Sequence, residues 1–189
     1  MGDRRKRRWV RRLLRYGEHM LAAAGAVLLI YHLAFDLSVV VSGSMAPALN
    51  GESYEGGERV LTENVSYWFR RPRRWEVVRF TSTEFGLHLQ VMKRVVGLPG
   101  ETVSLKDGQV CIDGEIVTPP ESLRDLRYVA VGNVWRGKSV ACGDGYYVLG
   151  DDTKDSEDSR YCGPIPPSKI RGRAWLVVSP SQSMRFVNP

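Results

Sequence analysis

Two serines flank a glycine in Ser42-Gly43-Ser44, which opens the stretch SGSMAPAL directly after an apolar run that ends at Val41. Ser and Gly favour tight turns and Pro47 would stop a helix, so a simple turn is one interpretation of this stretch. A serine hydroxyl can also act as a nucleophile, but only when a neighbouring base takes its proton. The chemical interpretation therefore requires a base elsewhere in the chain.

A candidate base is Lys93, in the segment FGLHLQVMKRVVGLPGE over residues 85–101. A lysine among aliphatic side chains can belong to an edge strand and reach water with its ammonium group. Alternatively, burial disfavours the charged form and lowers the lysine pKa, so that the free amine can deprotonate a serine. Strand alternation places these aliphatic residues on the face of Lys93: Leu87, Leu89, Val91 and Val95.

Histidine is a weaker candidate for the base. His19 and His32 lie before or within the apolar segment, and His88 falls on the strand face opposite Lys93, together with Gln90, Met92 and Arg94. A Ser-His-Asp triad would have to use His88. The acid-rich stretch GDDTKDSEDSR lacks the glycine and glutamate spacing of an EF-hand loop, and no Cys/His spacing indicates a metal. We therefore expect neither a metal nor another cofactor.

The N-terminal part has to position this chemistry. Residues 1–19 hold eight basic and two acidic side chains, which accounts for the whole formal net charge of +6. The remainder is neutral overall, so the charge does not indicate a nucleic-acid partner. The apolar stretch that follows is long enough to cross about 30 Å of hydrocarbon, although it contains His32 and Asp36.

We expect a transmembrane helix over residues 20–41; a cleavable secretory signal is the alternative. By the positive-inside rule, the basic segment 1–19 is cytoplasmic and residues 42–189 form the extracytoplasmic domain.

Residues 42–189 have the alternation and turn residues of an all-β domain. The stretches 75–80, 146–150 and 174–179 are short and rich in β-branched or aromatic residues, as strands are. Between residues 103 and 117, Asp107-Gly108 and Asp113-Gly114 are favoured hairpin-turn pairs. The proline-bearing stretch 117–125 is expected to be a loop. The pattern predicts a partly closed β-barrel of short strands.

Three segments in this order resemble the type I signal peptidases, membrane-bound Ser/Lys proteases that remove signal peptides, with the mitochondrial inner-membrane peptidases as close relatives. SGSMAPAL resembles the nucleophile box, and KRVVGLPGE, residues 93–101, resembles the general-base box. GDDTKDSEDSRYCGP, residues 150–164, resembles the third box, and WEVVRF matches the strand before the base. The resemblance covers nearly all of residues 38–178.

The resemblance implies that Ser44 is the nucleophile and Lys93 its general base. The side chain of Ser42 and the backbone N–H of Ser44 would form the oxyanion hole. Further implied roles are orientation of the lysine amine by Ser156, structural support from Asp158 with Arg160, and a substrate pocket lined by Met45.

Partners and location follow from the same resemblance. It implies signal-peptide-bearing preproteins and the lipid bilayer as partners. The location would be a plasma (inner) membrane, crossed once, and we expect a monomer.

Two positions depart from the family pattern. Asp152 stands where the family usually has asparagine, and Cys162 stands where tryptophan is common. Because the domain is expected outside the membrane, we predict a disulfide between Cys142 and Cys162 that would leave Cys111 as a buried thiol. Three reduced cysteines are the alternative.

Other functions remain open at this point. The chain could be a specialised processing protease, for pilin or mitochondrial inner-membrane substrates, that uses the same two residues. It could be a transpeptidase that uses Cys162 with Arg160 and His88, or a non-catalytic anchored β-domain.

The stretch YWFRRPRRW, residues 67–75, has four aromatic and four arginine residues that the family boxes do not include. Aromatic rings prefer the headgroup region and arginine is attracted to anionic lipid. We predict that this segment rests on the outer membrane face, a partly buried hairpin being the alternative.

Overall fold

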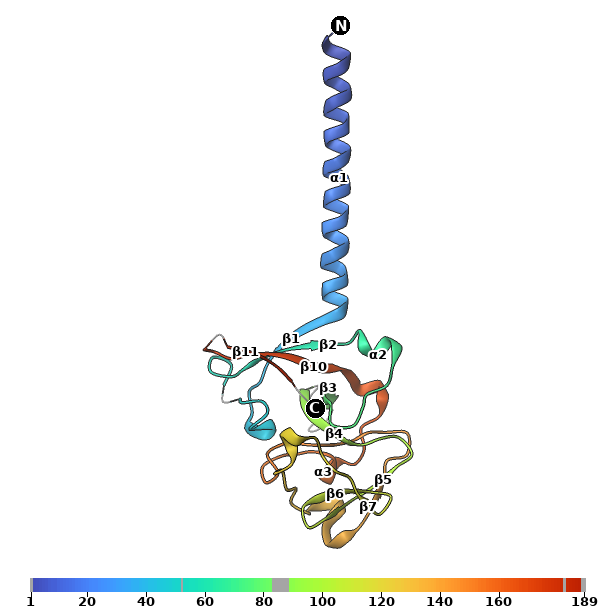
Figure 1. Cartoon of the computed structure of the whole chain (residues 1–189), viewed down its shortest axis with the longest axis vertical. Helices are drawn as coiled ribbons and strands as arrows, with labels where there is room; N and C mark the ends of the chain where they lie inside the picture. The colour runs from blue at the N-terminus through green and yellow to red at the C-terminus, as the bar shows by residue number, and fades with distance from the viewer. Residues whose placement is uncertain (1, 52, 83–88, 182, 188–189) are drawn as a thin grey trace. The chain divides into compact units, whose positions relative to one another are not determined.

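The computed structural model describes residues 2–51, 53–82, 89–181 and 183–187. The chain divides into two compact units, Met1–Phe35 and Asp36–Pro189 (Figure 1). The first unit is a long helix and the second unit is built mainly of β-strands.

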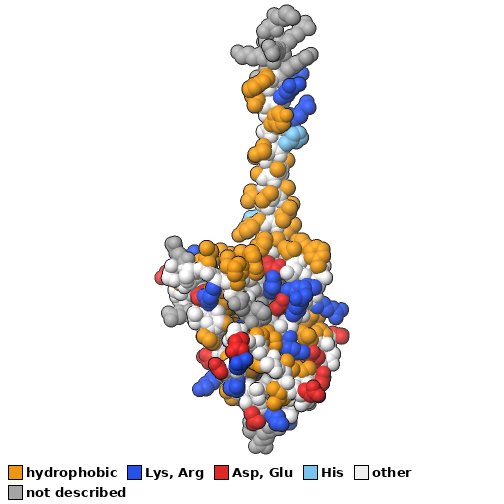
Figure 2. Space-filling view, in the orientation of Figure 1, with side chains coloured by type: hydrophobic (Ala, Val, Ile, Leu, Met, Phe, Trp, Pro, Cys, Tyr) orange, Lys and Arg blue, Asp and Glu red, His pale blue; other side chains and the backbone are white. Residues whose placement is uncertain are grey.

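The helix α1 spans Gly2–Ala34, and its part Arg11–Ala34 is long and apolar enough to cross a membrane. Figure 2 shows apolar side chains along this helix. It ends before the predicted limit of residue 41, because Phe35–Val39 form the strand β1. Asp36, expected inside the helix, instead forms an ion pair with Arg79, 2.7 Å between Nη2 and Oδ2.

The larger sheet carries most of the candidate site residues. In the part of the chain that the structure describes it has seven strands, in the order β1-β2-β10-β3-β4-β9, with β11 beside β10. The strands β3 and β4 are rich in valine, which suits a pleated and buried surface. The further bounds are β2 (Arg59–Glu63), β3 (Val77–Ser82), β4 (Leu89–Gly97), β9 (Tyr147–Leu149), β10 (Ile170–Val178) and β11 (Met184–Phe186).

The smaller sheet has the order β7-β6-β5-β8 among the described strands. Its strands are β5 (Thr102–Lys106), β6 (Gln109–Ile112), β7 (Glu115–Ile116) and β8 (Val140–Ala141). Asp107 and Asp113 both have φ of 51°, and Gly108 and Gly114 follow with positive φ. Two successive residues with positive φ are what type I′ turns require. Both predicted hairpins are confirmed.

Short helices connect these strands. They are η1 (Gly43–Met45), α2 (Ser66–Phe69), η3 (Glu121–Leu123), η4 (Gly132–Gly137), α3 (Ser159–Cys162) and η5 (Pro167–Lys169). The predicted loop 117–125, which the structure describes throughout, contains no strand, and its one regular piece is the short 3-10 helix η3. The predicted strands at 75–80, 146–150 and 174–179 correspond to β3, β9 and β10.

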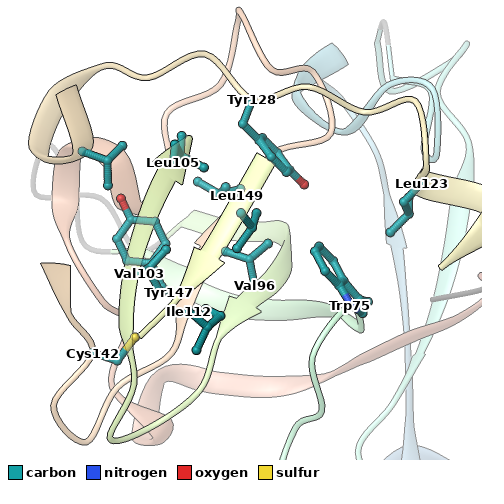
Figure 3. Close-up of a cluster of buried hydrophobic side chains, with 12 residues drawn as sticks. Trp75, Val96, Val103, Leu105, Ile112, Leu123, Tyr128, Cys142, Tyr147 and Leu149 are labelled. Atoms are coloured by element: carbon teal, nitrogen blue, oxygen red, sulfur yellow. The ribbon is translucent and has the colours of Figure 1, made fainter. Parts of the chain in front are cut away.

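A shared core joins the two sheets (Figure 3). Val96 of β4 and Leu149 of β9 come from the larger sheet, and Val103 and Ile112 come from the smaller one. Burial of side chains of this size favours folding by roughly 1.5–3 kcal/mol each. The expected all-β domain is confirmed, but the described strands leave both sheets with open edges, so no closed barrel forms.

Candidate active site

Ser44 and Lys93 meet although they lie far apart in the sequence. Lys93 Nζ lies 2.6 Å from Ser44 Oγ and is hydrogen-bonded to it. The lysine is only 2% exposed. Burial lowers the pKa of Lys93 below its usual value, while the charge of Asp158 raises it and that of Arg160 lowers it. Burial therefore makes the neutral amine more accessible than in an exposed lysine, and the amine is in contact with a hydroxyl that it could deprotonate.

Strand β4 brings Lys93 into the interior. Val95 is buried and Val91 packs beside it, in a cluster with Val78 and Phe80 of β3. Leu89 is exposed, and Leu87 and His88 lie outside the described residues. The prediction that Lys93 is buried is confirmed, and among the described residues Val91 and Val95 supply the apolar strand neighbours.

The nucleophile candidate lies on the single turn η1. The N–H of Ala46 donates to Gly43 O at 2.8 Å, and Ser42 precedes the turn in an extended conformation. Met45 and Leu49 are buried in a cluster with Val40. Ser42 Oγ lies 3.3 Å from Ser44 Oγ. The turn therefore presents two hydroxyls on one side while its apolar side chains anchor it to the core.

Gly150 is where the third box approaches Ser44. A Cβ atom at this position would lie 2.1 Å from Ser156 Oγ and 2.5 Å from Ser44 O. Any side chain would therefore push the two serines away from the backbone. The next contact along the loop is the N–H of Asp152, which donates to Ser44 O at 3.1 Å.

Asp158 organises the remainder of the third box. Its Oδ2 accepts bonds from Ser156 Oγ at 2.8 Å and from the N–H of Gly150 at 3.0 Å. Arg160 donates through Nε to Oδ1 at 2.8 Å and through Nη2 to Oδ2 at 2.7 Å. Arg160 Nη1 also binds Thr153 O, so the pair is held to the loop that it supports. Because the Ser156 proton is directed to Asp158, the Ser156 oxygen is left as an acceptor.

The pair Arg94–Asp151 has no counterpart in the sequence analysis. Arg94 Nε and Nη2 donate to the two Asp151 oxygens at 2.8 and 2.6 Å, and Nη1 donates to Trp75 O. Both side chains are almost fully buried. Losing one member of such a pair typically costs about 3–5 kcal/mol, because it leaves a buried charge uncompensated. The one feature of the sequence that could have indicated this pair was Arg94 itself, a charged residue next to Val95 and Val96 in a predicted strand.

The two departures from the family pattern are accommodated locally. Asp152 Oδ1 accepts from the N–H groups of Lys154 and Asp155 at 3.1 and 3.0 Å, which an asparagine oxygen could equally do. Cys162 is exposed on α3 and its thiol donates to Asp158 O at 3.3 Å.

The predicted Cys142–Cys162 disulfide is wrong. All three cysteines are thiols, and Cys111 is buried as expected. Cys142 packs in the core shared by the sheets (Figure 3), whereas Cys162 takes part in the hydrogen bonds of α3. The alternative that used Cys162 as a nucleophile is not favoured, because Arg160 is paired with Asp158. Its third residue, His88, lies outside the described residues.

Among the side chains that the structure describes, no group of three or more His, Cys, Asp and Glu is arranged to hold a metal ion.

Comparisons with known proteins agree on one family. The profile of the family described as signal peptidase, peptidase S26, matches residues 13–179. A probable signal peptidase I-2 from Synechocystis sp. is 31% identical over 168 residues, covering 86% of this chain and 72% of that protein. A signal peptidase I from Leptolyngbya laminosa is 35% identical over 162 residues, covering 79% and 71%.

Two further matches are with proteins of Bacillus subtilis and Enterococcus faecalis. Signal peptidase I V of Bacillus subtilis is 30% identical over 159 residues, covering 79% of this chain and 92% of that protein. A crystal structure of a signal peptidase I from Enterococcus faecalis V583 is 28% identical, with a TM-score of 0.44, over 55% of this chain and 97% of that one. A score this low does not by itself establish a shared fold. From the family profile and the curated relatives, the protein is a peptide-bond hydrolase and belongs to the signal peptidase family, peptidase S26.

Proposed function

We propose that this protein is a membrane-anchored serine endopeptidase that removes N-terminal signal peptides from exported preproteins by a Ser44–Lys93 dyad. The observation that carries the mechanism is the 2.6 Å contact between Lys93 Nζ and Ser44 Oγ, made by a lysine that is 2% exposed. A nucleophile in direct contact with a base of lowered pKa is the arrangement that covalent catalysis requires.

The first chemical step forms a tetrahedral intermediate. Lys93 takes the Ser44 proton as Ser44 Oγ attacks the scissile carbonyl carbon, and the developing oxyanion accepts from Ser42 Oγ and the N–H of Ser44. The closeness of Ser42 Oγ to Ser44 Oγ supports this role. Removing one such donor typically lowers the rate about 10²–10³-fold.

The second step breaks the scissile C–N bond and forms the acyl-enzyme, and a third step, hydrolysis, releases the signal peptide. Lys93, now protonated, donates its proton to the leaving amine, and the mature protein departs. The neutral amine then activates a water molecule against the acyl-enzyme, which restores Ser44. Ser156 orients the amine by accepting one of its N–H groups, a role supported by the donation of its own proton to Asp158. Asp158 and Arg160 hold this loop in place.

Met45 follows the proposed nucleophile in the sequence and is buried in the core. Met45 is packed with Val40 and Leu49, and the partly buried Met92 lies against the same cluster. We assign Met45 to the pocket for the residue before the cut. The substrate would lie extended, since strand edges bind extended peptides through their backbone.

The helix α1 would anchor the enzyme, with residues 1–19 in the cytoplasm and the domain 42–189 on the outer side of the plasma membrane. Exposed apolar side chains on the larger sheet and α2 support a further contact with the lipid surface. We name them the apolar face: Leu37, Trp68, Phe69, Trp175 and Phe186. Trp175 and Phe186 have ring centroids 5.8 Å apart.

Only some side chains of residues 67–75 could make the predicted contact with lipid. Tyr67 donates to Glu76 and Trp75 is buried in the core, so neither ring is available to lipid. Arg70 and Arg74 are paired with Glu76 and Glu101. Trp68 and Phe69, 60% and 84% exposed, are the aromatic residues of the segment that can reach a bilayer.

The deciding experiment compares cleavage of a signal-bearing preprotein by the detergent-solubilised full chain and its variants. Ser44→Ala and Lys93→Ala should each abolish cleavage, and the double variant should be no worse, because the two groups act as a unit. Lys93→Ala with more than about a tenth of wild-type activity would contradict the dyad, since a general base typically contributes about 10²–10⁴-fold.

Matched controls exclude a general effect of losing a serine or lysine. Ser168→Ala and Lys138→Ala change exposed residues away from the site and should leave the rate unchanged. Thiol alkylation should also spare activity, whereas a cysteine nucleophile would be inactivated.

A further inference from the structure

The C-terminal strand β11 lies beyond the family match, which ends at residue 179. It nevertheless reaches the loop that carries the nucleophile. Arg185, in the middle of β11, donates through Nη2 to Ala48 O at 2.8 Å. Ala48 is four positions after Ser44 in the same loop.

Glu58 completes this link. Arg185 Nη1 and Nη2 bind Glu58 Oε1 and Oε2 at 2.7 and 2.8 Å, in a two-pronged ion pair. Glu58 Oε2 also accepts from the N–H of Asn50 at 2.8 Å. The Glu58 side chain is almost fully buried, while Arg185 is partly exposed. Charge-assisted pairs of this geometry are among the stronger and more directional hydrogen bonds in proteins.

The backbone of Glu58 holds both ends of the loop as well. Its N–H donates to Asn50 O at 3.0 Å, and its carbonyl accepts from the N–H of Val40 at 2.9 Å. Residue 57 approaches Val40 so closely that a Cβ atom there would lie 2.0 Å from Val40 O, which only glycine allows. Glu58 therefore contacts the chain before and after the nucleophile turn, and Arg185 fixes its carboxylate.

We propose that Arg185 and Glu58 are positioning residues that hold the loop 43–50 so that Ser44 Oγ stays within reach of Lys93 Nζ. This inference rests on the proposed role of Ser44 as the nucleophile. The path is short: Arg185 binds Ala48 O, the N–H of Leu49 donates to Met45 O at 2.9 Å, and Met45 adjoins Ser44.

Loss of positioning lowers the rate of catalysis in the folded enzyme, whereas a general loss of stability lowers only the amount of folded enzyme. A displacement of about 1 Å at a reacting atom can lower the rate about 10²-fold, even when the substitution is remote from the chemistry. The protein contains a twin of this ion pair that lacks the link to Ser44. Glu63 is also buried, accepts from a backbone N–H, that of Ser66, and is paired with a partly exposed arginine, Arg173, whose Nη1 also lies 3.6 Å from Glu76 Oε1.

The test compares Arg185→Gln with the matched control Arg173→Gln in the full-length protein. Both variants remove an arginine from a buried glutamate, so their melting temperatures should fall by similar amounts. Hydrolysis of a short soluble peptide should separate them: kcat falls about tenfold or more in Arg185→Gln with KM little changed, and stays within about twofold in Arg173→Gln. Equal kcat values in the two variants would overturn the proposal.

A small ester makes it possible to measure the reactivity of Ser44 separately from the binding of a peptide substrate. The rate at which p-nitrophenyl acetate acetylates Ser44, followed by mass spectrometry, should fall in Arg185→Gln as much as kcat does. Glu58→Gln should lose a similar factor, and the double variant should lose no more than either single one, because both break the same link. Additive losses would mean that the two residues act separately.

Rescue keeps the proposal testable if Arg185→Gln folds poorly. Arg185 lines a cavity of about 410 Å³ together with Ala48 and Phe186, so a small cation can enter there. Arg185→Ala should regain kcat with millimolar guanidinium chloride but not with sodium chloride, and Arg185→Lys should retain part of the activity. No rescue in a folded Arg185→Ala variant would contradict the proposal. Ser44→Ala, run in parallel, shows whether the nucleophile assignment itself has failed.

Discussion

At the residue scale, the site depends on one buried lysine between opposite charges. Burial favours the neutral amine of Lys93, the nearby carboxylates of Asp158 and Asp151 favour the ammonium, and Arg160 opposes them. Because Asp158 is itself paired with Arg160, the lysine does not meet an uncompensated negative charge. Desolvation therefore sets the direction of the pKa shift.

This direction predicts the pH dependence. Since the lysine pKa is lowered, the neutral and active amine persists to lower pH than in an exposed lysine, and activity falls as the pH drops through the lowered value. The rate of hydrolysis of a soluble peptide should therefore rise with pH along a limb whose midpoint is below the ordinary lysine value of 10.5.

Serine acetylation by a small ester should follow the same limb, because both reactions need the same base. A midpoint at or above the ordinary lysine value would show that Lys93 is not desolvated in solution, and the general-base assignment would lose its support.

At the scale of the elements, the sequence predicted those elements that depend only on residues close together in the chain. The hairpins at Asp107-Gly108 and Asp113-Gly114 need only their own turn residues, and they form as predicted. The end of α1 could not be predicted in this way, because Phe35–Val39 become a strand by pairing with β2. The strand β11 was missed for the same reason, since its partner is β10.

The short helix α2 is the element that the lipid-contact hypothesis depends on. Its neighbours hold it firmly, through the ion pair of Arg70 with Glu76 and the bond from the N–H of Ser66 to Glu63. Trp68 and Phe69 are thus presented on a fixed support.

We predict that Trp68→Ala combined with Phe69→Ala slows preprotein cleavage by the full chain in anionic vesicles by about tenfold, since burying a large apolar side chain is worth roughly 1.5–3 kcal/mol. Hydrolysis of a short soluble peptide in detergent should be unchanged. A control that removes two other exposed apolar side chains, Ile116→Ala in β7 with Val129→Ala in the loop after η3, should affect neither assay. Equal loss of both activities in the Trp68 and Phe69 variant would refute lipid contact.

At the scale of the whole molecule, long-range ion pairs join segments that the sequence gives no reason to connect. Glu58 and Arg185 are 127 positions apart. Ser44 and Lys93 could be singled out as candidates for nucleophile and base because their surroundings resemble family boxes, but a pair formed only by folding leaves no local pattern. The same holds for the pair of Arg94, which lies in β4, with Asp151, which lies in the loop after β9.

These pairs predict a loss of stability in acid. The hydrogen bond from Arg185 lowers the pKa of Glu58. Burial raises the pKa of Glu76, but the hydrogen bonds from Arg70 and from the N–H of Arg73 outweigh burial, so the pKa of Glu76 is also lowered. Carboxylates with a lowered pKa in the folded state stabilise it above their unfolded pKa, and the contribution disappears as pH falls through the folded value. Urea unfolding of the full chain should therefore show a free energy of unfolding that decreases from about pH 5 downward.

A variant provides the check on this cause. Glu58→Gln should be less stable than wild type at neutral pH and should lose less on acidification, because one of the linked protons has been removed. Identical slopes for the variant and the wild type would assign the acid sensitivity to other groups.

The packing of Met45 and Leu49 has a consequence for control of the enzyme. Because these neighbours of Ser44 belong to the buried core, the same event that folds the domain also brings Ser44 and Lys93, the proposed nucleophile and base, together. Such a protease would have no latent form that awaits activation, and it would be competent as soon as it is folded. Protection of other exported proteins would then depend on which peptide bonds are presented to it, in an extended form and at the right distance from the membrane, rather than on switching the enzyme on or off.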